Sequence, residues 1–101
     1  MKTDIYQGDI LKIENISYPV LVVSKDFFNR SGEIIGCPIL KTGKQGSLHL
    51  RLSTDGHERF VQCEQLKLFD LNARGYSKKG EISLIDRITV SDTIQGLFEY
   101  M

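Results

Sequence analysis

The sequence predicts a mainly β protein, a small antiparallel β-barrel with one C-terminal α-helix. Short apolar stretches recur at regular intervals and are separated by glycines and other turn residues, which is typical of a compact β-rich fold. Only the C-terminal end carries a helical pattern, so the alternation of strands and helices that a parallel sheet requires is absent. The length of 101 residues accommodates one domain, residues 1–101, and favours a shallow or dimer-formed site over a deep pocket.

Three strands are expected in the first 40 residues. Residues 6–13 alternate loosely between apolar and polar and predict the first strand. Residues 19–24, Pro-Val-Leu-Val-Val-Ser, are short and almost wholly apolar, which predicts a central strand buried on both faces. A turn is expected at residues 29–32, followed by a third strand over residues 33–40. Because Pro38 has no backbone N–H, it must lie at an edge, at a bend or at the exit of that strand.

The clearest alternation in the chain lies in residues 47–53. It directs Leu48, Leu50 and Leu52 to the core, and it places the polar residues Ser47, His49, Arg51 and Ser53 on the opposite face. In the next strand Val61 and Cys63 share one side, but Leu66 and Leu68 fall out of phase with them. The sequence therefore predicts a bulge or a strand break near residues 64 and 65.

The last 31 residues predict a surface loop and a helix. Residues 71–80 contain three basic residues, no acidic residue and two glycines, which indicates a loop. From Ser91, an N-cap residue type, apolar side chains follow at helical spacing: Ile94, Leu97, Phe98 and Met101. We expect this segment to form one amphipathic helix packed on the sheet.

The overall charge favours no particular class of partner. Thirteen basic residues balance thirteen acidic ones, so any site for a polyanion must be local. No apolar run has the length of a membrane span or a signal segment, which predicts a cytoplasmic protein with no membrane contact. Cys37 and Cys63 stand alone in apolar surroundings and are interpreted as buried, reduced thiols, with a disulfide or a metal role as the alternative.

No familiar cofactor or metal motif is present. The sequence lacks a Gly-rich phosphate loop, the HExxH and CxxC spacings and GxSxG, so no cofactor and no metal ion are predicted. The informative feature is two basic segments without acidic residues, one with Lys41, Lys44 and Arg51 and the other with Arg74, Lys78 and Lys79. If the fold joins them, they form a phosphate-binding groove, and otherwise they are solvated loop residues.

In their order and spacing, these segments resemble the MazF/PemK toxins of bacterial toxin-antitoxin systems. The matching motifs are Gly8-Asp9-Ile10, residues 19–24, Asn29 with Gly32, Cys37-Pro38, residues 65–70, and residues 73–80, Ala-Arg-Gly-Tyr-Ser-Lys-Lys-Gly. Together they span nearly the whole chain. The resemblance implies an SH3-like barrel of the CcdB/MazF type, a homodimer and an antitoxin protein as partner. It also implies metal-independent cleavage of single-stranded RNA, the activity of an endoribonuclease or mRNA interferase.

Such cleavage requires a base, a proton donor and positive charge around the phosphate that the 2′-hydroxyl attacks. Members of the family place an Arg before the proline of the second strand and a Ser or Thr shortly after the proline of the third. This sequence has Tyr18 and then Ile39-Leu40 at those positions. The catalytic candidates are therefore Thr42 for the hydroxyl, Lys41 or Arg51 for positive charge, and His49 or Tyr18 for proton transfer.

The resemblance also supplies RNA-binding candidates. Gln65 matches a family position near the bound RNA, and Arg74 matches a basic residue of the loop motif. With the lysines of both basic segments, the expected RNA-binding set is Lys41, Lys44, Gln65, Arg74, Lys78 and Lys79.

Two other functions remain open. A module of the same fold could bind RNA, DNA or a protein without cutting, because a Tyr18 phenol carries no charge to hold a phosphate. Alternatively, the chain could be a CcdB-type toxin that acts on a protein, with residues 96–101 as the contact instead of a packed helix end.

Overall fold

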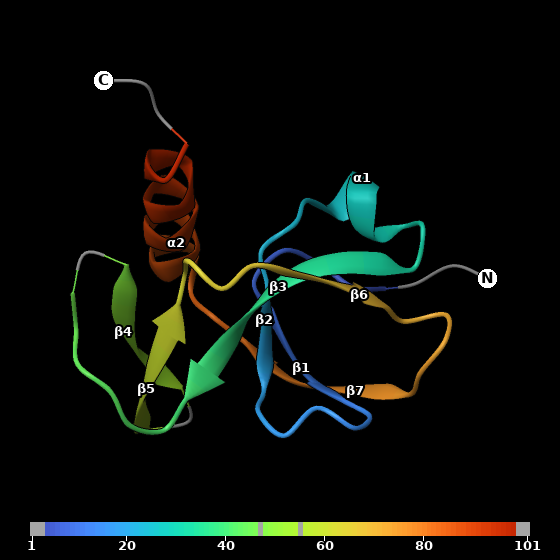
Figure 1. Cartoon of the computed structure of the whole chain (residues 1–101), viewed down its shortest axis with the longest axis horizontal. Coiled ribbons are helices and arrows are strands. Elements are labelled where there is room, and N and C mark those ends of the chain that lie inside the picture. The colour runs from blue at the N-terminus through green and yellow to red at the C-terminus, as the bar shows by residue number, and fades with distance from the viewer. Residues whose placement is uncertain (1–3, 47, 55, 99–101) are drawn as a thin grey trace.

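A computed structural model describes residues 4–46, 48–54 and 56–98 of the chain. Its elements, in order, are β1 (Asp9–Ile13), β2 (Val20–Val22), α1 (Asp26–Asn29), β3 (Glu33–Leu40), β4 (His49–Thr54), β5 (His57–Gln62), β6 (Lys67–Asp70), β7 (Tyr76–Glu81) and α2 (Leu84–Gly96). All strand pairs are antiparallel, and α2 lies at the C-terminal end (Figure 1). The predicted mainly β class with a C-terminal helix is confirmed.

The sheet is organised around a bend in β3. The strand order is β4-β5-β3-β2-β1-β7, and β6 pairs with β3. β3 pairs with β6 through Glu33–Gly36 and with β5 through Ile39 and Leu40, so Pro38 falls in the gap between these two pairings. On the other side of β3, Ile39 N donates to Pro19 O, which leaves the adjacent Val20 and Pro38 as a pair that needs no hydrogen bond. Of the three places expected for Pro38, an edge, a bend or the strand exit, it occupies the point where β3 changes its partner from β6 to β5.

Two apolar clusters occupy the two faces of the central strands. One contains Ile10 and Leu21 together with Val61 and Val90 from β5 and α2, and the other contains Leu11 and both valines of β2. Successive residues of β1 and β2 therefore enter different clusters, and the prediction that β2 is buried on both faces is confirmed.

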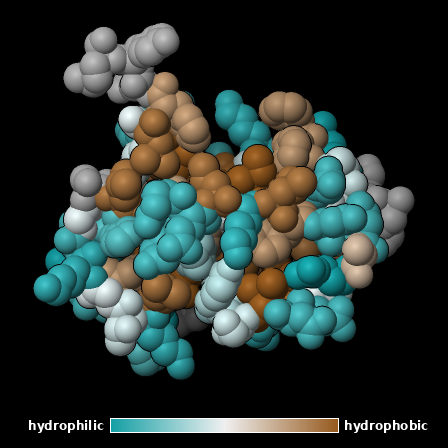
Figure 2. All heavy atoms as spheres, in the orientation of Figure 1, coloured by the Kyte–Doolittle hydropathy of each residue, from teal (hydrophilic) through white to brown (hydrophobic). Residues whose placement is uncertain are grey.

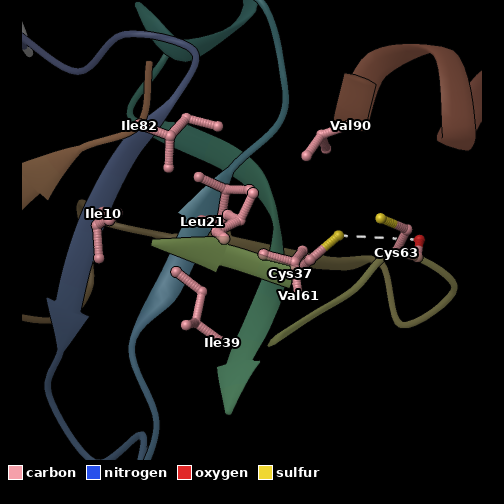
Figure 3. Packing of buried hydrophobic residues seen from close by; sticks show 9 residues of the cluster. Ile10, Leu21, Cys37, Ile39, Val61, Cys63, Ile82 and Val90 are labelled. Carbon is pink, nitrogen blue, oxygen red and sulfur yellow. Dashed lines mark hydrogen bonds between the residues drawn. The ribbon is translucent and has the colours of Figure 1, made fainter. Parts of the chain in front are cut away.

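Both cysteines belong to the first cluster (Figure 3). They are fully buried and not joined by a disulfide, in agreement with the interpretation from the sequence. The Cys37 thiol donates to the Cys63 carbonyl oxygen over 3.9 Å. Burial raises the pKa of Cys37 to about 12 and that of Cys63 to about 11, so both thiols stay protonated at neutral pH.

The phase slip after β5 is a strand break. β5 ends at Gln62, a turn follows, and β6 begins at Lys67. Because the chain restarts in a new register, Phe69 is buried in β6 while Leu68 is exposed. In β4 the predicted alternation holds, since Leu52 is buried, Leu50 packs against the core, and Arg51 and Ser53 are exposed. Ser47 lies outside the described residues.

The surface loop predicted for residues 71–80 is wrong in its second half. Residues 76–81 form β7, an edge strand that pairs with β1. Almost all of its side chains are exposed, so no apolar alternation marks it in the sequence. A lysine-rich edge strand of this kind is one way in which proteins prevent further strand addition.

Both helices also differ from the prediction. α1 is a single turn, Asp26–Asn29, between the strand expected over residues 19–24 and the turn expected at residues 29–32, where no helix was predicted. α2 begins at Leu84, seven residues before the expected N-cap, because the Ser83 hydroxyl accepts the Asp86 N–H and caps it. Val90 and Ile94 pack against the core, but Phe98 is 75% exposed and Met101 lies outside the described residues. None of the described helices is long and apolar enough to cross a bilayer.

Candidate functional site

The two positions where the sequence departs from the family pattern lie on either side of one backbone hydrogen bond. Ile39 N donates to Pro19 O over 2.9 Å, which brings the chain just before β2, with Tyr18, close to the end of β3, with Leu40. Tyr18 is half-buried and packs against the second apolar cluster. This pair of residues stands where the chain leaves β3 for the loop that carries Lys41 and Thr42.

The loop after β3 presents free cations and a hydroxyl. Lys41, Thr42 and Lys44 are all exposed, and within the described ranges neither lysine has a carboxylate within 4 Å. Gly43 lies against the Phe60 ring, where an added Cβ would come within 3.3 Å of Cγ. This contact holds the loop against β5 and leaves its polar side chains in solvent, where they can meet a phosphate.

A second polar group lies at the start of β4. His49 Nε2 is 2.9 Å from Glu64 Oε2, and this hydrogen bond lowers the pKa of the Glu64 carboxyl. Gln65 is exposed in the same turn and is held by its backbone N–H to Gln62 O. A carboxylate on one ring nitrogen orients an imidazole and leaves its other nitrogen for proton transfer. Glu64 was not predicted as a site residue, although the sequence predicted a bulge or a strand break near residues 64 and 65.

Arg51 shares the polar face of β4 with His49, as predicted, but it is paired. Its guanidinium Nη1 lies 3.1 Å from Glu58 Oε2 across the β4-β5 hairpin, and both side chains are more than half exposed. A phosphate would therefore have to displace a carboxylate from Arg51. An exposed ion pair of this kind is weak, so displacing Glu58 from Arg51 costs little free energy.

The two basic segments lie on different strands of the sheet. β7 and β4 stand at opposite ends of the path through the sheet, so Arg51 is separated in the strand order from Lys78 and Lys79, whereas Lys41 and Lys44 follow β3. Arg74 and Lys79 are exposed and have no carboxylate within 4 Å in the described part of the chain.

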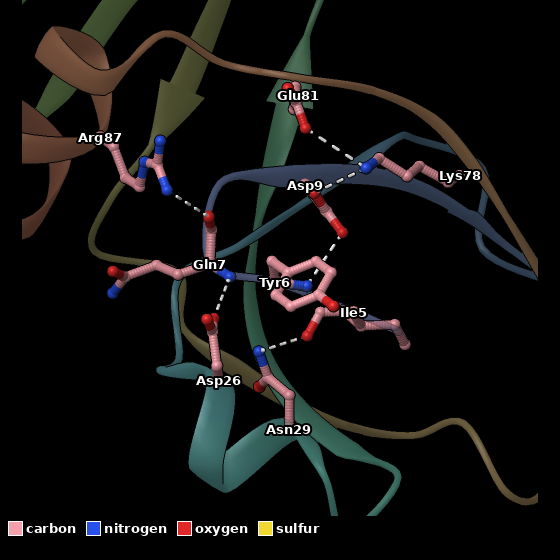
Figure 4. Close-up of polar contacts among 9 residues, drawn as sticks. All are labelled: Ile5, Tyr6, Gln7, Asp9, Asp26, Asn29, Lys78, Glu81 and Arg87. Atoms are coloured by element: carbon pink, nitrogen blue, oxygen red, sulfur yellow. Dashed lines mark hydrogen bonds and ion pairs between the residues drawn. The ribbon is translucent and has the colours of Figure 1, made fainter. Parts of the chain in front are cut away.

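Lys78 instead holds β7 to β1. Its Nζ lies 3.2 Å from Asp9 Oδ1 and 3.3 Å from Glu81 Oε1, and these two carboxylates raise its pKa, with Asp9 making the larger contribution (Figure 4). Asp9 is buried, and its other oxygen accepts the Tyr6 N–H at 2.9 Å. The Lys78 predicted for RNA binding thus neutralises a buried carboxylate of the Gly8-Asp9-Ile10 motif.

Asn29, another residue of the matching motifs, is a buried link between segments. Its amide donates to Ser24 O at 3.1 Å and to Ile5 O at 3.4 Å, which ties α1 to the chain before β1 (Figure 4). Its role in the structure is therefore to fix the backbone. Across the described residues, no group of three or more His, Cys, Asp or Glu side chains is arranged to hold a metal ion.

Comparisons with known proteins agree on one family and one fold. Residues 4–98 match the family model described as PemK-like, MazF-like toxin of type II toxin-antitoxin system. The MazE-MazF crystal structure from Deinococcus radiodurans is similar, with a TM-score of 0.81 at 20% identity over 92% of this chain and 94% of that one. An endoribonuclease from a mycobacterial species gives a TM-score of 0.77 at 17% identity over 99% of both chains. An endoribonuclease in complex with its cognate antitoxin, also mycobacterial, gives 0.74 at 16% identity over 95% and 99%. No curated protein matches the sequence.

Proposed function

Because the chain belongs to the PemK-like, MazF-like toxin family of type II toxin-antitoxin systems, we propose that it is a one-domain toxin that cleaves single-stranded RNA without a metal ion. The observation that carries the proposal is the family match itself, which spans residues 4–98 and so contains every candidate site residue. The similar structures are less than 25% identical and support the fold alone.

The proposed reaction is an internal transesterification. The 2′-oxygen forms a bond to the adjacent phosphorus, the bond from phosphorus to the 5′-oxygen breaks, and the products carry 2′,3′-cyclic phosphate and 5′-hydroxyl ends. His49, oriented by Glu64, takes the proton of the 2′-hydroxyl. Lys41 and Arg51 stabilise the charge on the phosphorane. Thr42 or Tyr18 supplies the hydroxyl that protonates the leaving 5′-oxygen.

The proposal includes a homodimer. Lys44 and Gln65 would bind RNA near β4, and Arg74, Lys78 and Lys79 would bind it near β7. Two copies would join these groups into one longer basic track. An acidic segment of an antitoxin would cover such a track, and its affinity would fall as the salt concentration rises.

Two observations favour the alternative of a module that binds without cutting. Tyr18 and Leu40 provide neither a guanidinium nor an aliphatic hydroxyl at the exit of β3, and Arg51 is paired with Glu58. The exposure of Phe98 is the specific support for a CcdB-type contact with a protein at the C-terminal end. Residues 99–101 of that contact lie outside the described residues.

The test is incubation of the purified protein with a long single-stranded RNA in EDTA, followed by mapping of the product ends. Thr42→Ala and Arg51→Ala are compared with Ser53→Ala, which removes an exposed side chain from the same face of β4 as Arg51. Discrete cuts with cyclic phosphate ends, lost in the first two variants and kept in the third, support the proposal. Intact RNA that still binds in fluorescence anisotropy supports the non-cutting module, and cuts that persist in both Thr42→Ala and Arg51→Ala overturn the proposed site.

A further inference from the structure

A groove between α1 and α2 contains opposite charges and an exposed aromatic ring. Three adjoining hollows of about 280, 300 and 240 Å³ share Gln7 as their floor. The first hollow is lined by Asp26 and Phe27 of α1 and by Arg87 of α2, together with Lys25. Figure 2 shows hydrophilic and apolar side chains side by side on the surface between the two helices. A ligand of this hollow must therefore suit both charges and an apolar ring.

The backbone of Gln7 holds the two charged side chains in place. Gln7 N donates to Asp26 Oδ1 at 2.9 Å, and Gln7 O accepts Arg87 Nη1 at 3.4 Å (Figure 4). Gly8 follows with φ +98°, and the Arg87 side chain lies against it, with Cδ 3.2 Å from where a Cβ would stand. A residue with a side chain would be strained at this φ and would displace Arg87. Gly8 thus makes room for the arginine at the hollow.

The carboxylate and the guanidinium line the same hollow but do not pair with each other. Within the described residues, neither Asp26 nor Arg87 has an oppositely charged group within 4 Å. Asp26 Oδ2 receives no protein donor in these ranges, and Arg87 makes no hydrogen bond there beyond the one to Gln7 O. Hydrogen bonds to charged groups are the strong ones. A ligand that offers donors to α1 and acceptors to α2 would satisfy both side chains.

The aromatic ring narrows the class of ligand. Phe27 is 69% exposed at this hollow. Exposed aromatic side chains beside cations stack well on nucleobases, because every base has a flat π-face. A zwitterion such as a free amino acid would also meet both charges, but it would leave the Phe27 ring uncovered. The combination therefore favours a planar heterocycle with donors on one edge and acceptors on another.

Guanine is the nucleobase with this arrangement of edges. Its N1 and N2 groups donate side by side, which suits a carboxylate, and its O6 and N7 accept side by side, which suits a guanidinium. Adenine and cytosine offer a carboxylate only one amino group, and uracil offers only its ring N–H. Lys25 is exposed and has no carboxylate within 4 Å among the described residues, so it can meet the phosphate of the nucleotide.

We propose that this hollow binds a guanine base, with Asp26 accepting from N1 and N2, Arg87 donating to O6 and N7, and Phe27 stacked on the ring. The base belongs to an RNA strand or to a free guanine nucleotide, since both present the same edges. The site goes beyond the proposed function, because none of its residues takes part in the proposed cleavage. Failure of one activity therefore leaves the other unaffected.

The test is an NMR titration of the ¹⁵N-labelled full chain with guanosine 5′-monophosphate. Three analogues carry the same phosphate, so its contribution cancels in the comparison. The inosine analogue lacks the N2 amino group, the 7-deazaguanosine analogue lacks N7, and the adenosine analogue has a different order of donors and acceptors. We expect chemical shift changes at the backbone amides of Gln7 and Phe27, and dissociation constants at least about fivefold weaker for each analogue.

Substitutions assign each edge of the base to its protein partner. Asp26→Asn keeps an oxygen for the Gln7 N–H and should abolish the preference over the inosine analogue. Arg87→Gln should abolish the preference over the 7-deazaguanosine analogue. Phe27→Ala should weaken the binding of all four nucleotides, and Arg30→Gln, at an exposed arginine that lines none of these hollows, should weaken none. Because Asp26 and Phe27 are exposed, their variants test the proposal even if Arg87→Gln does not fold.

Three results would overturn the proposal. The first is equal affinity for the guanosine and adenosine nucleotides or no shift change at Gln7. The second is the same set of shifts with free leucine, which would assign the hollow to a zwitterion. The third is a set of shifts that depends on protein concentration without ligand and disappears in Phe27→Ala, which would assign it to a second copy of the chain. The short RNA UUGUU then identifies the source of the base: tighter binding than the mononucleotide indicates an RNA strand, and equal or weaker binding indicates a free nucleotide.

Discussion

Substitution of Lys78 tests whether this lysine stabilises the fold, as its contact with Asp9 indicates, or mainly binds RNA. Lys78→Met removes the ammonium that neutralises Asp9 and keeps most of the aliphatic stem. Lys79→Met is the matched control, because Lys79 is the next residue of the same edge strand and is exposed without an ion pair among the described residues. Both variants lose one positive charge, so any effect on RNA affinity through net charge is the same.

The expected difference follows from the burial of Asp9. Its side chain is 2% exposed, whereas that of Lys78 is 45% exposed. Loss of Nζ leaves Oδ1 without a donor, and an unmet hydrogen bond to a charged group costs about 1.5–3 kcal/mol. Because water can reach the place that the exposed ammonium leaves, we expect a cost around or below the lower end of that range, about 1–2 kcal/mol. For a domain of this size, this corresponds to a fall in Tm of roughly 5–10 °C.

The assay is thermal unfolding followed by circular dichroism at one protein concentration, first at pH 7 and then at rising pH. Asp9 and Glu81 raise the folded pKa of Lys78 above its ordinary value of 10.5. The stabilisation is therefore fully present below pH 10.5 and is lost as the pH rises through the folded pKa. The gap between wild type and Lys78→Met should close over that range. Equal melting temperatures for the Lys78 and Lys79 variants at pH 7 would refute this account of Asp9.

Three further predictions concern the core, the β4 site and the thiols. Gly36→Ala should cost about 1–3 kcal/mol in urea unfolding, because its Cβ would collide with the buried Val20 side chain, and the cost should shrink when Val20→Ala is also present. The pKa of the Glu64 carboxyl, followed by NMR, should lie below its ordinary value of 4.5. Its small contribution to stability is therefore present above pH 4.5 and is lost as the pH falls through the folded pKa. An unchanged titration of Glu64 in His49→Gln would show that the hydrogen bond to His49 is not the cause. Cys37 and Cys63 should resist iodoacetamide at pH 8 in the folded protein and react on unfolding, as read by mass spectrometry, because burial holds both pKa values near 11 or above; rapid alkylation of the folded chain would contradict this.

The strands with an apolar pattern could be predicted from the sequence, and the elements without one could not. β2, β3 and β4 carry runs or alternations of apolar residues that the core requires, so their place in the sheet follows from local composition. β7 is exposed along almost its whole length, and its stability comes from pairing with β1, a contact between residues about 70 positions apart. α2 begins early because Ser83 caps it, although its first two turns expose three apolar residues to solvent, Leu84, Ile85 and Ile88.

The candidate site divides in the same way. Residue types alone identified the exposed Lys41, Thr42 and Lys44, and the alternation in β4 placed His49 and Arg51 on one face. The partners that decide what those groups can do, Glu64 for His49 and Glu58 for Arg51, come from chain segments that only the hairpin and its turn bring close. The sequence does not distinguish Glu64 and Glu58 from the other acidic residues, because the role of a carboxylate depends on the group that it faces in the folded chain.

The sequence by itself determined the fold class, the family and the burial of both cysteines, since each follows from local patterns of apolar residues and from the order of short motifs. Tertiary structure alone decided that Lys78 neutralises buried Asp9, that Glu64 faces His49, and that Glu58 pairs with Arg51. The physical reason is that hydropathy acts residue by residue, whereas the Coulomb interaction between two groups depends on a distance that exists only once the chain has folded.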